Sequence, residues 1–142
     1  MRNYYSRIQR DMGSCPFVTN VAKSAISNNN YRTAIWTGGS LQMTLMCIPV
    51  NSDIGLEIHN ENDQLIRVEQ GFATVKMGEC EKWLDYQTNA FAGDTIFVPA
   101  GTWHNVINAG RIPLRLSTVY APPHHPAGTI HYTKEDSEKE NY

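Results

Sequence analysis

A series of short β-prone segments, separated by turn residues, constrains the fold of this chain more than any other feature. About nine such segments can be read from the sequence: 33–36, 41–50, 55–59, 64–70, 72–77, 82–86, 95–98, 103–108 and 114–120. Turn sequences such as Thr37-Gly38-Gly39-Ser40 and Gly78-Glu79-Cys80-Glu81 lie between them. No long stretch has the 3.6-residue periodicity of a helix. This spacing predicts an all-β, antiparallel sandwich or barrel.

The length of the chain fits one domain. With 142 residues, of which 41% are hydrophobic, it can bury a moderate core, but two full domains would be cramped. We expect an N-terminal arm over residues 1–32, a barrel over 33–133 and a charged tail over 134–142. The tail should form a short exposed helix or a frayed end.

Composition excludes several classes of protein. The net charge is −2, which disfavours a nucleic-acid binder because such proteins usually carry a basic stripe. No window reaches about 18 consecutive apolar residues, so we expect no membrane segment. The charged N-terminus lacks the apolar core of a secretory signal. Cys15, Cys47 and Cys80 form no paired motif, which favours a reducing cytoplasm and three buried or half-buried thiols.

Two segments carry side chains suited to chemistry. Glu57 and His59 are two residues apart, so on a strand both point to the same face. The turn Pro99-Ala100-Gly101-Thr102 can return the chain so that His104 points inward from a neighbouring strand. With Gln64, these side chains bring a carboxylate, an amide oxygen and two imidazoles toward one point.

That group of side chains predicts a metal site. Two histidines and one carboxylate on one side of a metal, with open positions left over, are the ligands of non-haem iron oxygenases. Similar ligands suit zinc, manganese or nickel. We therefore expect one divalent ion (Fe, Mn, Zn or Ni) as cofactor, held by Glu57, His59, Gln64 and His104.

The second segment resembles a motif of the cupin superfamily, G-x5-P-x-G-x2-H-x3-N. Every fixed position of that motif is matched, by Gly93, Pro99, Gly101, His104 and Asn108. The first cupin motif, G-x5-HxH-x3,4-E-x6-G, is matched in spacing but only partly in residue type.

In that first motif, His59 takes the second histidine position and Gly71 the closing glycine. Glu57 stands where the first histidine is expected, Gln64 where glutamate is usual, and Asn51 where the opening glycine would be. The role of the usual glutamate therefore cannot be transferred to Gln64.

A second register makes His59 the first histidine and Glu61 its partner, but it leaves too few residues before Gln64. Glu57 is the preferred carboxylate ligand, and Glu61 is the alternative.

The resemblance implies a double-stranded β-helix (jelly-roll) barrel, a metal inside it, and a homodimer. Residues 120–131, Tyr-Ala-Pro-Pro-His-His-Pro-Ala-Gly-Thr-Ile-His, also resemble the tail of small bacterial cupins labelled mannose-6-phosphate isomerase-like. This likeness extends back to about residue 32.

For function, we expect a metal-dependent cupin that binds a small polar molecule, with a sugar or sugar-acid isomerase as the leading version. Glu57 and Tyr120 are the candidate catalytic residues, as proton shuttle and acid; a purely structural Tyr120 is the other reading. The alternatives are a non-catalytic ligand-binding cupin and a non-haem iron dioxygenase. His124 and His125 are expected at the surface, and His131 has no predicted partner. The two motifs contain only two histidines, so a metal there needs oxygen ligands unless these tail histidines fold back toward it.

Overall fold

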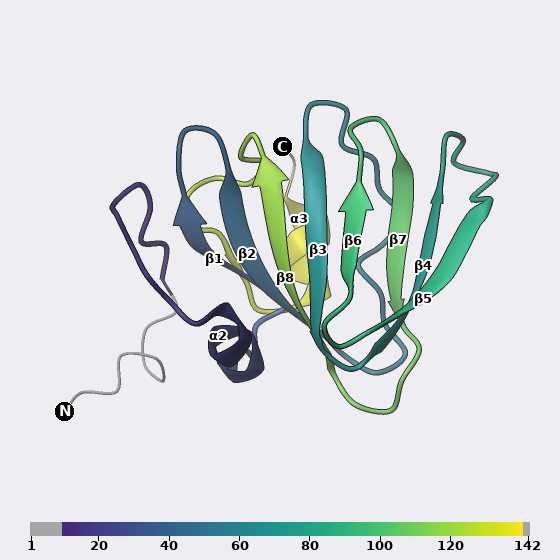
Figure 1. The fold of residues 1–142 in the computed structure, drawn as a ribbon, viewed down its shortest axis with the longest axis horizontal. Helices are drawn as coiled ribbons and strands as arrows, with labels where there is room; N and C mark the ends of the chain where they lie inside the picture. The colour runs from purple at the N-terminus through teal and green to yellow at the C-terminus, as the bar shows by residue number, and fades with distance from the viewer. Residues whose placement is uncertain (1–9, 141–142) are drawn as a thin grey trace.

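The computed structural model describes residues 10–140. Short helices flank a run of strands, as Figure 1 shows. The elements are α2 (Val21–Ser27), β1 (Arg32–Thr37), β2 (Gln42–Ile48), β3 (Asp63–Gln70), β4 (Phe72–Gly78), β5 (Tyr86–Phe91), β6 (Thr95–Val98), β7 (Trp103–Asn108), β8 (Leu114–Ala121), β9 (Ile130–His131) and α3 (Lys134–Lys139). The all-β prediction is confirmed.

The strands form two antiparallel sheets. The larger sheet has the order β6-β3-β8-β2-β1-β9, and the smaller one has the order β5-β4-β7. In Figure 1 the smaller sheet lies beyond β6. A single apolar cluster contains Met46 and Leu116 of the larger sheet together with Val75 and Val106 of the smaller one, so the core lies between the sheets.

The buried interior is apolar at one end and polar at the other. The apolar part includes Met46, Ile48, Ile66, Val68, Val75, Val106, Leu114 and Leu116. The inward positions further along the same strands are polar but equally buried: Gln42, Thr44, Gln64, His104, Thr118 and Tyr120. In the register of the larger sheet, Tyr120 faces Gln42 on one side and Gln64 on the other. Since a buried polar side chain is costly unless it has a partner, this end of the barrel is the place to look for a site.

Helices α2 and α3 lie outside the barrel core. Helix α2 contributes Ala25 to a second apolar cluster with Ile35 and Leu45, and the Asn20 side chain accepts a hydrogen bond from the Lys23 amide at its start. Helix α3 has no buried residue and begins with a capping box between Thr133 and Asp136. The expected short, exposed C-terminal helix is therefore present. Among the described residues, no helix has the length and apolar character needed to cross a membrane.

Two of the predicted strands are wrong. Residues 55–59 form no strand: Glu57 and His104 make an isolated bridge, and the segment opens on Gly55 with φ of 87°, outside the extended region. The strand expected at 82–86 instead runs over Tyr86–Phe91, after a longer turn. All but one of its residues are exposed, so it lacks the apolar alternation that reveals a strand.

Other sequence-based expectations also differ from the structure. The predicted arm contains the short helix α2, in which four of the seven residues are Val, Ala or Ile. Cys15 and Cys80 are exposed rather than buried, whereas Cys47 is half-buried as expected.

The turn that connects β4 to β5 depends on Gly78. A Cβ at this position would lie 2.3 Å from the Trp83 carbonyl oxygen and 3.0 Å from Leu84 Cα. We expect Gly78→Ala to lower the free energy of unfolding by about 1–3 kcal/mol, because backbone atoms must shift to make room. Gly39→Ala is the matched control, since a Cβ there meets nothing within 4 Å. Equal urea denaturation midpoints for the two variants would show that the close approach is unimportant.

Candidate metal centre

Backbone pairing between the two motif segments positions the candidate ligands. The Glu57 amide donates to the His104 carbonyl oxygen at 3.0 Å, and the His104 amide donates to the Glu57 carbonyl oxygen at 2.9 Å. Residues paired in this way present their side chains to the same face. The Gly101 amide donates to the His59 carbonyl oxygen at 2.9 Å and ties the turn before β7 to the same segment.

The side chains of Glu57, His59 and His104 converge. His59 Nε2 lies 3.2 Å from Glu57 Oε1, and His104 Nε2 lies 3.4 Å from the same oxygen. One ligand atom from each residue falls within 4.8 Å of the other two. The two imidazole rings are 5.3 Å apart and tilted by 52°. This group could hold a metal ion.

The hydrogen bonding of these atoms fits a metal. His59 Nε2, His104 Nε2 and Gln64 Oε1 are fully buried and have no hydrogen-bond partner of acceptable geometry among the described residues. His104 Nδ1 lies 2.9 Å from the Thr102 carbonyl oxygen, so Nδ1 carries the proton and the Nε2 lone pair is left for a cation. Two imidazole nitrogens with carboxylate and amide oxygens suit a divalent Fe, Mn, Zn or Ni ion.

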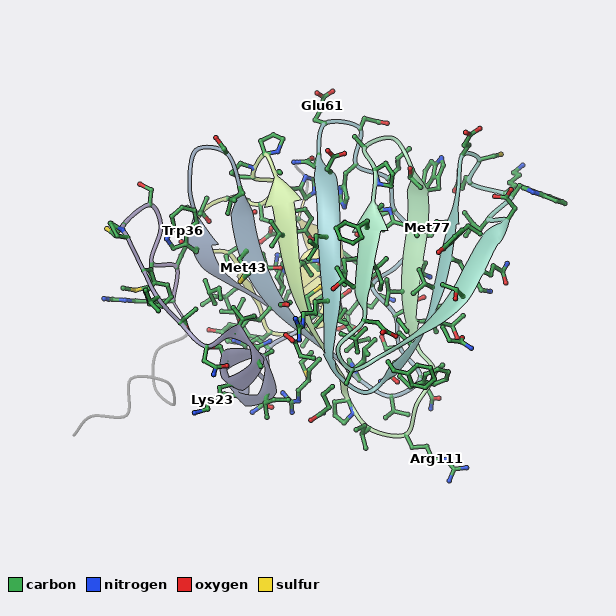
Figure 2. The ribbon with its side chains drawn as sticks, viewed as in Figure 1. Lys23, Trp36, Met43, Glu61, Met77 and Arg111 are labelled. Atoms are coloured by element: carbon green, nitrogen blue, oxygen red, sulfur yellow. The ribbon has the colours of Figure 1, made fainter. Side chains whose placement is uncertain are left out.

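The candidate carboxylates differ in position. Glu57 is half-buried beside the two histidines, whereas Glu61 is exposed at the tip of the loop before β3, as Figure 2 shows. Gln64 is buried in β3 with its amide oxygen unpaired, and its role as a fourth ligand stays a prediction.

Glu57 is held in its charged form. Burial alone would raise the pKa of its carboxyl, but the close approach of the His104 and His59 side chains holds that pKa well below its usual range. Glu57 is thus ionised at neutral pH and can bind a cation without first losing a proton.

Tyr120 lies deep in the polar end of the barrel. It is fully buried, its ring is 5.7 Å from that of His59, and its hydroxyl lies 3.3 Å from His125 Nε2. Burial raises the pKa of Tyr120, and the positive charge of Arg32 only partly opposes this effect. The phenol is therefore protonated at neutral pH.

The tail histidines are not at the surface, contrary to the sequence interpretation. His125 and His131 are buried, and the half-buried His124 ring lies 4.2 Å from that of His59. His131 does have partners, because its Nδ1 lies 3.1 Å from Arg32 Nη1 and its Nε2 lies 3.0 Å from Glu140 Oε2. The tail folds back onto the barrel, which local sequence patterns do not reveal.

Gln42 holds the returning tail in place. Its Oε1 accepts hydrogen bonds from the backbone amides of His124, at 3.2 Å, and His125, at 2.9 Å. Its Nε2 donates to the His125 carbonyl oxygen at 2.9 Å. In the sequence, the signal for a polar partner here is a glutamine within the β-prone segment 41–50.

The burial of His125 predicts a dependence of stability on pH. Burial, assisted by the charge of Arg32, lowers the pKa of His125 from 6.5 to about 2. Below about pH 6.5 the unfolded chain binds a proton at His125 that the folded chain does not. The free energy of unfolding therefore decreases as the pH is lowered, by up to about 1.4 kcal/mol per pH unit. In His125→Gln this slope should be shallower by that amount. Urea unfolding of both proteins at about pH 7 and about pH 5 tests this, and identical slopes would contradict it.

Together, the jelly-roll fold and the two histidine motifs define a cupin. The Cupin domain family matches residues 44–120, which is more than half of the chain, and the chain belongs to that family.

Its relatives include the uncharacterized protein YrkC of Bacillus subtilis (strain 168). YrkC is 52% identical over 128 residues, which cover 90% of this chain and 69% of YrkC. The uncharacterized protein L612 of Acanthamoeba polyphaga mimivirus is 38% identical over 122 residues, covering 85% of this chain and 74% of L612. The crystal structure of BH2720 from Bacillus halodurans matches with a TM-score of 0.91 and 48% identity, over 92% of this chain and 99% of that one. These names do not bear on the mannose-6-phosphate isomerase-like grouping, which stays a prediction.

Proposed function

We propose that this cupin is a metal-dependent enzyme that acts on a small, hydroxyl-bearing substrate, such as a sugar or sugar acid, in an isomerisation. The observation that carries the proposal is the convergence of His59 Nε2, His104 Nε2 and Glu57 Oε1, whose nitrogens lack hydrogen-bond partners. The Glu57 side chain is 28% exposed, so the group can be reached from solvent.

The acid–base groups of an isomerisation are supplied by the chain itself. When bound, a divalent ion supplies Lewis acidity that polarises a carbonyl or hydroxyl of the substrate. Glu57 Oε1 faces the imidazoles, which leaves Oε2 to accept a proton from the carbon next to a carbonyl. Tyr120 keeps its proton at neutral pH and can donate it to an oxygen of the substrate. Glu57 then returns its proton to the neighbouring carbon, and Tyr120 takes back a proton from the other oxygen. The substrate keeps its composition, and both side chains recover their starting protonation states.

An oxygenase is the second candidate function, and the identity of the candidate ligands is the observation that supports it. Two histidines and one carboxylate with open positions are typical of non-haem Fe(II) oxygenases. Oxygen uptake by the Fe(II)-loaded protein with each candidate substrate separates this reaction from an isomerisation.

Deuterium exchange tests the isomerase proposal. Protein loaded with Mn, Fe, Zn or Ni is incubated in D₂O with aldoses, uronates and sugar phosphates, and NMR detects deuterium at the carbon next to the carbonyl. We expect exchange and product formation with one substrate class, and a loss of about 10²- to 10⁴-fold in Tyr120→Phe at unchanged metal content. Tight binding with neither exchange nor oxygen uptake would identify a binding module instead.

A further inference from the structure

A groove of about 520 Å³ lies beside the candidate metal centre, between the turn that links β4 to β5 and the loop before β7. Its lining includes Met77, Glu79, Trp83, Asp85, Tyr86 and Thr102. A volume of this size accommodates a small organic ligand. The groove adjoins the metal centre, because Thr102 carries the carbonyl that holds His104 Nδ1 and Met77 faces His104 in the β4–β7 ladder.

The local chain holds two aromatic rings at this groove without burying them. The Trp83 amide donates to the Cys80 carbonyl oxygen at 3.0 Å and closes the turn, and the close approach to Gly78 fixes its position. The Trp83 side chain is nevertheless 71% exposed and that of Tyr86 is 57% exposed. Large aromatic surfaces left open in a concave site are typical of ligand recognition.

The charge of the groove selects the kind of ligand. Glu79 and Asp85 line it, and neither side chain forms an ion pair or hydrogen bond with any residue in 10–140. No lysine or arginine is in the lining. Lys82 lies in the same turn but is offset by its neighbour Glu81, so the segment 79–85 remains negative. Aromatic faces next to uncompensated carboxylates attract organic cations.

We propose that this groove is a binding site for an organic cation, whose ammonium group lies against Trp83 and Tyr86 and is neutralised by Glu79 and Asp85. The site is separate from the Glu57, His59 and His104 group and does not depend on what reaction the metal centre performs. A ligand held there lies next to the backbone of a metal-ligating histidine, so the groove can also orient a molecule that extends toward the metal.

Choline and its neutral isostere 3,3-dimethylbutan-1-ol provide the test. The two have nearly the same shape, and only choline is charged. In ¹H–¹⁵N spectra of the protein as purified, choline should shift the indole signal of Trp83, which the Trp83→Phe variant identifies. The neutral isostere should bind at least about tenfold more weakly. Equal affinity for both compounds, or no shift with choline, would overturn the proposal.

Variants assign the binding to the groove. Trp83→Ala should abolish choline binding, monitored then through the backbone amides of residues 78–86, and Glu79→Gln with Asp85→Asn should weaken it about tenfold. Glu81→Gln is the control, because Glu81 is in the same turn but not in the lining. Trp83 and both carboxylates are exposed, so these variants should keep the thermal stability of the wild type. Choline binding that survives Trp83→Ala would place the site elsewhere and refute the proposal.

Discussion

His104→Ala and His59→Ala are each expected to lower the affinity of the protein for its divalent ion by about 100-fold or more. Loss of a residue that only supports a ligand already costs about 10- to 100-fold, and here the ligand itself is removed. Both Nε2 atoms face Glu57 and have no other partner among the described residues. Elemental analysis of proteins purified without added metal measures the effect, with about one ion per chain expected for the wild type and far less for either variant.

Thermal unfolding gives a second measure of the same binding. A metal present at about 100 times its Kd stabilises the folded state by about 2.7 kcal/mol, so added metal should raise the melting temperature of the wild type but not of the variants. His131→Gln is the control, because His131 is buried outside the group and contacts Arg32 and Glu140 instead. Unchanged metal content in His59→Ala and His104→Ala would show that these histidines are not ligands.

Local patterns in the sequence were sufficient to predict the class of fold and the positions of most strands. The last long strand, β8, alternates inward Leu114, Leu116 and Tyr120 with outward residues, and this alternation is visible in the sequence. Strand β5 lies beyond the range that the sequence predicts, because it is an exposed edge strand with little apolar alternation. Edge strands need only one partner and can be polar, so pattern analysis locates them poorly.

The candidate site was predictable to the extent that its ligands lie in local motifs. Glu57, His59 and His104 come from two short segments, and the turn residues between them indicate how they approach one another. The return of the tail depends on contacts over long sequence separations, such as Gln42 with His125 and Arg32 with His131. No periodicity encodes such contacts, which is why the sequence predicts surface positions for His124 and His125 and no partner for His131.

The groove beside the candidate metal centre is not evident from the sequence, for the same reason. Trp83 and Glu79 lie in a turn that reads as an ordinary hairpin connection, whereas Thr102 belongs to a separate loop. Only the pairing of β4 with β7 brings the two segments together. This pairing is what places the groove next to His104 and the candidate metal centre.

Glu57→Gln is expected to weaken metal binding by at least about 100-fold while the fold is retained. The substitution keeps the size of the side chain but removes the negative charge that partly neutralises a divalent ion. The backbone bonds between Glu57 and His104 do not involve this side chain, so the two segments should stay paired. A Co²⁺-loaded sample provides the readout, because its visible absorption reports the ligand set and its titration gives the Kd.

Glu61→Gln is the matched control for this substitution. It removes the same charge four residues away, from an exposed position at the tip of the loop, and should leave the Co²⁺ spectrum and Kd unchanged. A larger loss of affinity in Glu61→Gln than in Glu57→Gln would make Glu61 the carboxylate ligand and restore the register that the motif spacing disfavours. A comparison with Gln64→Leu then measures how much the amide oxygen of Gln64 contributes to the affinity for Co²⁺. Its loss should weaken binding less than loss of the carboxylate does, because the amide carries no net charge.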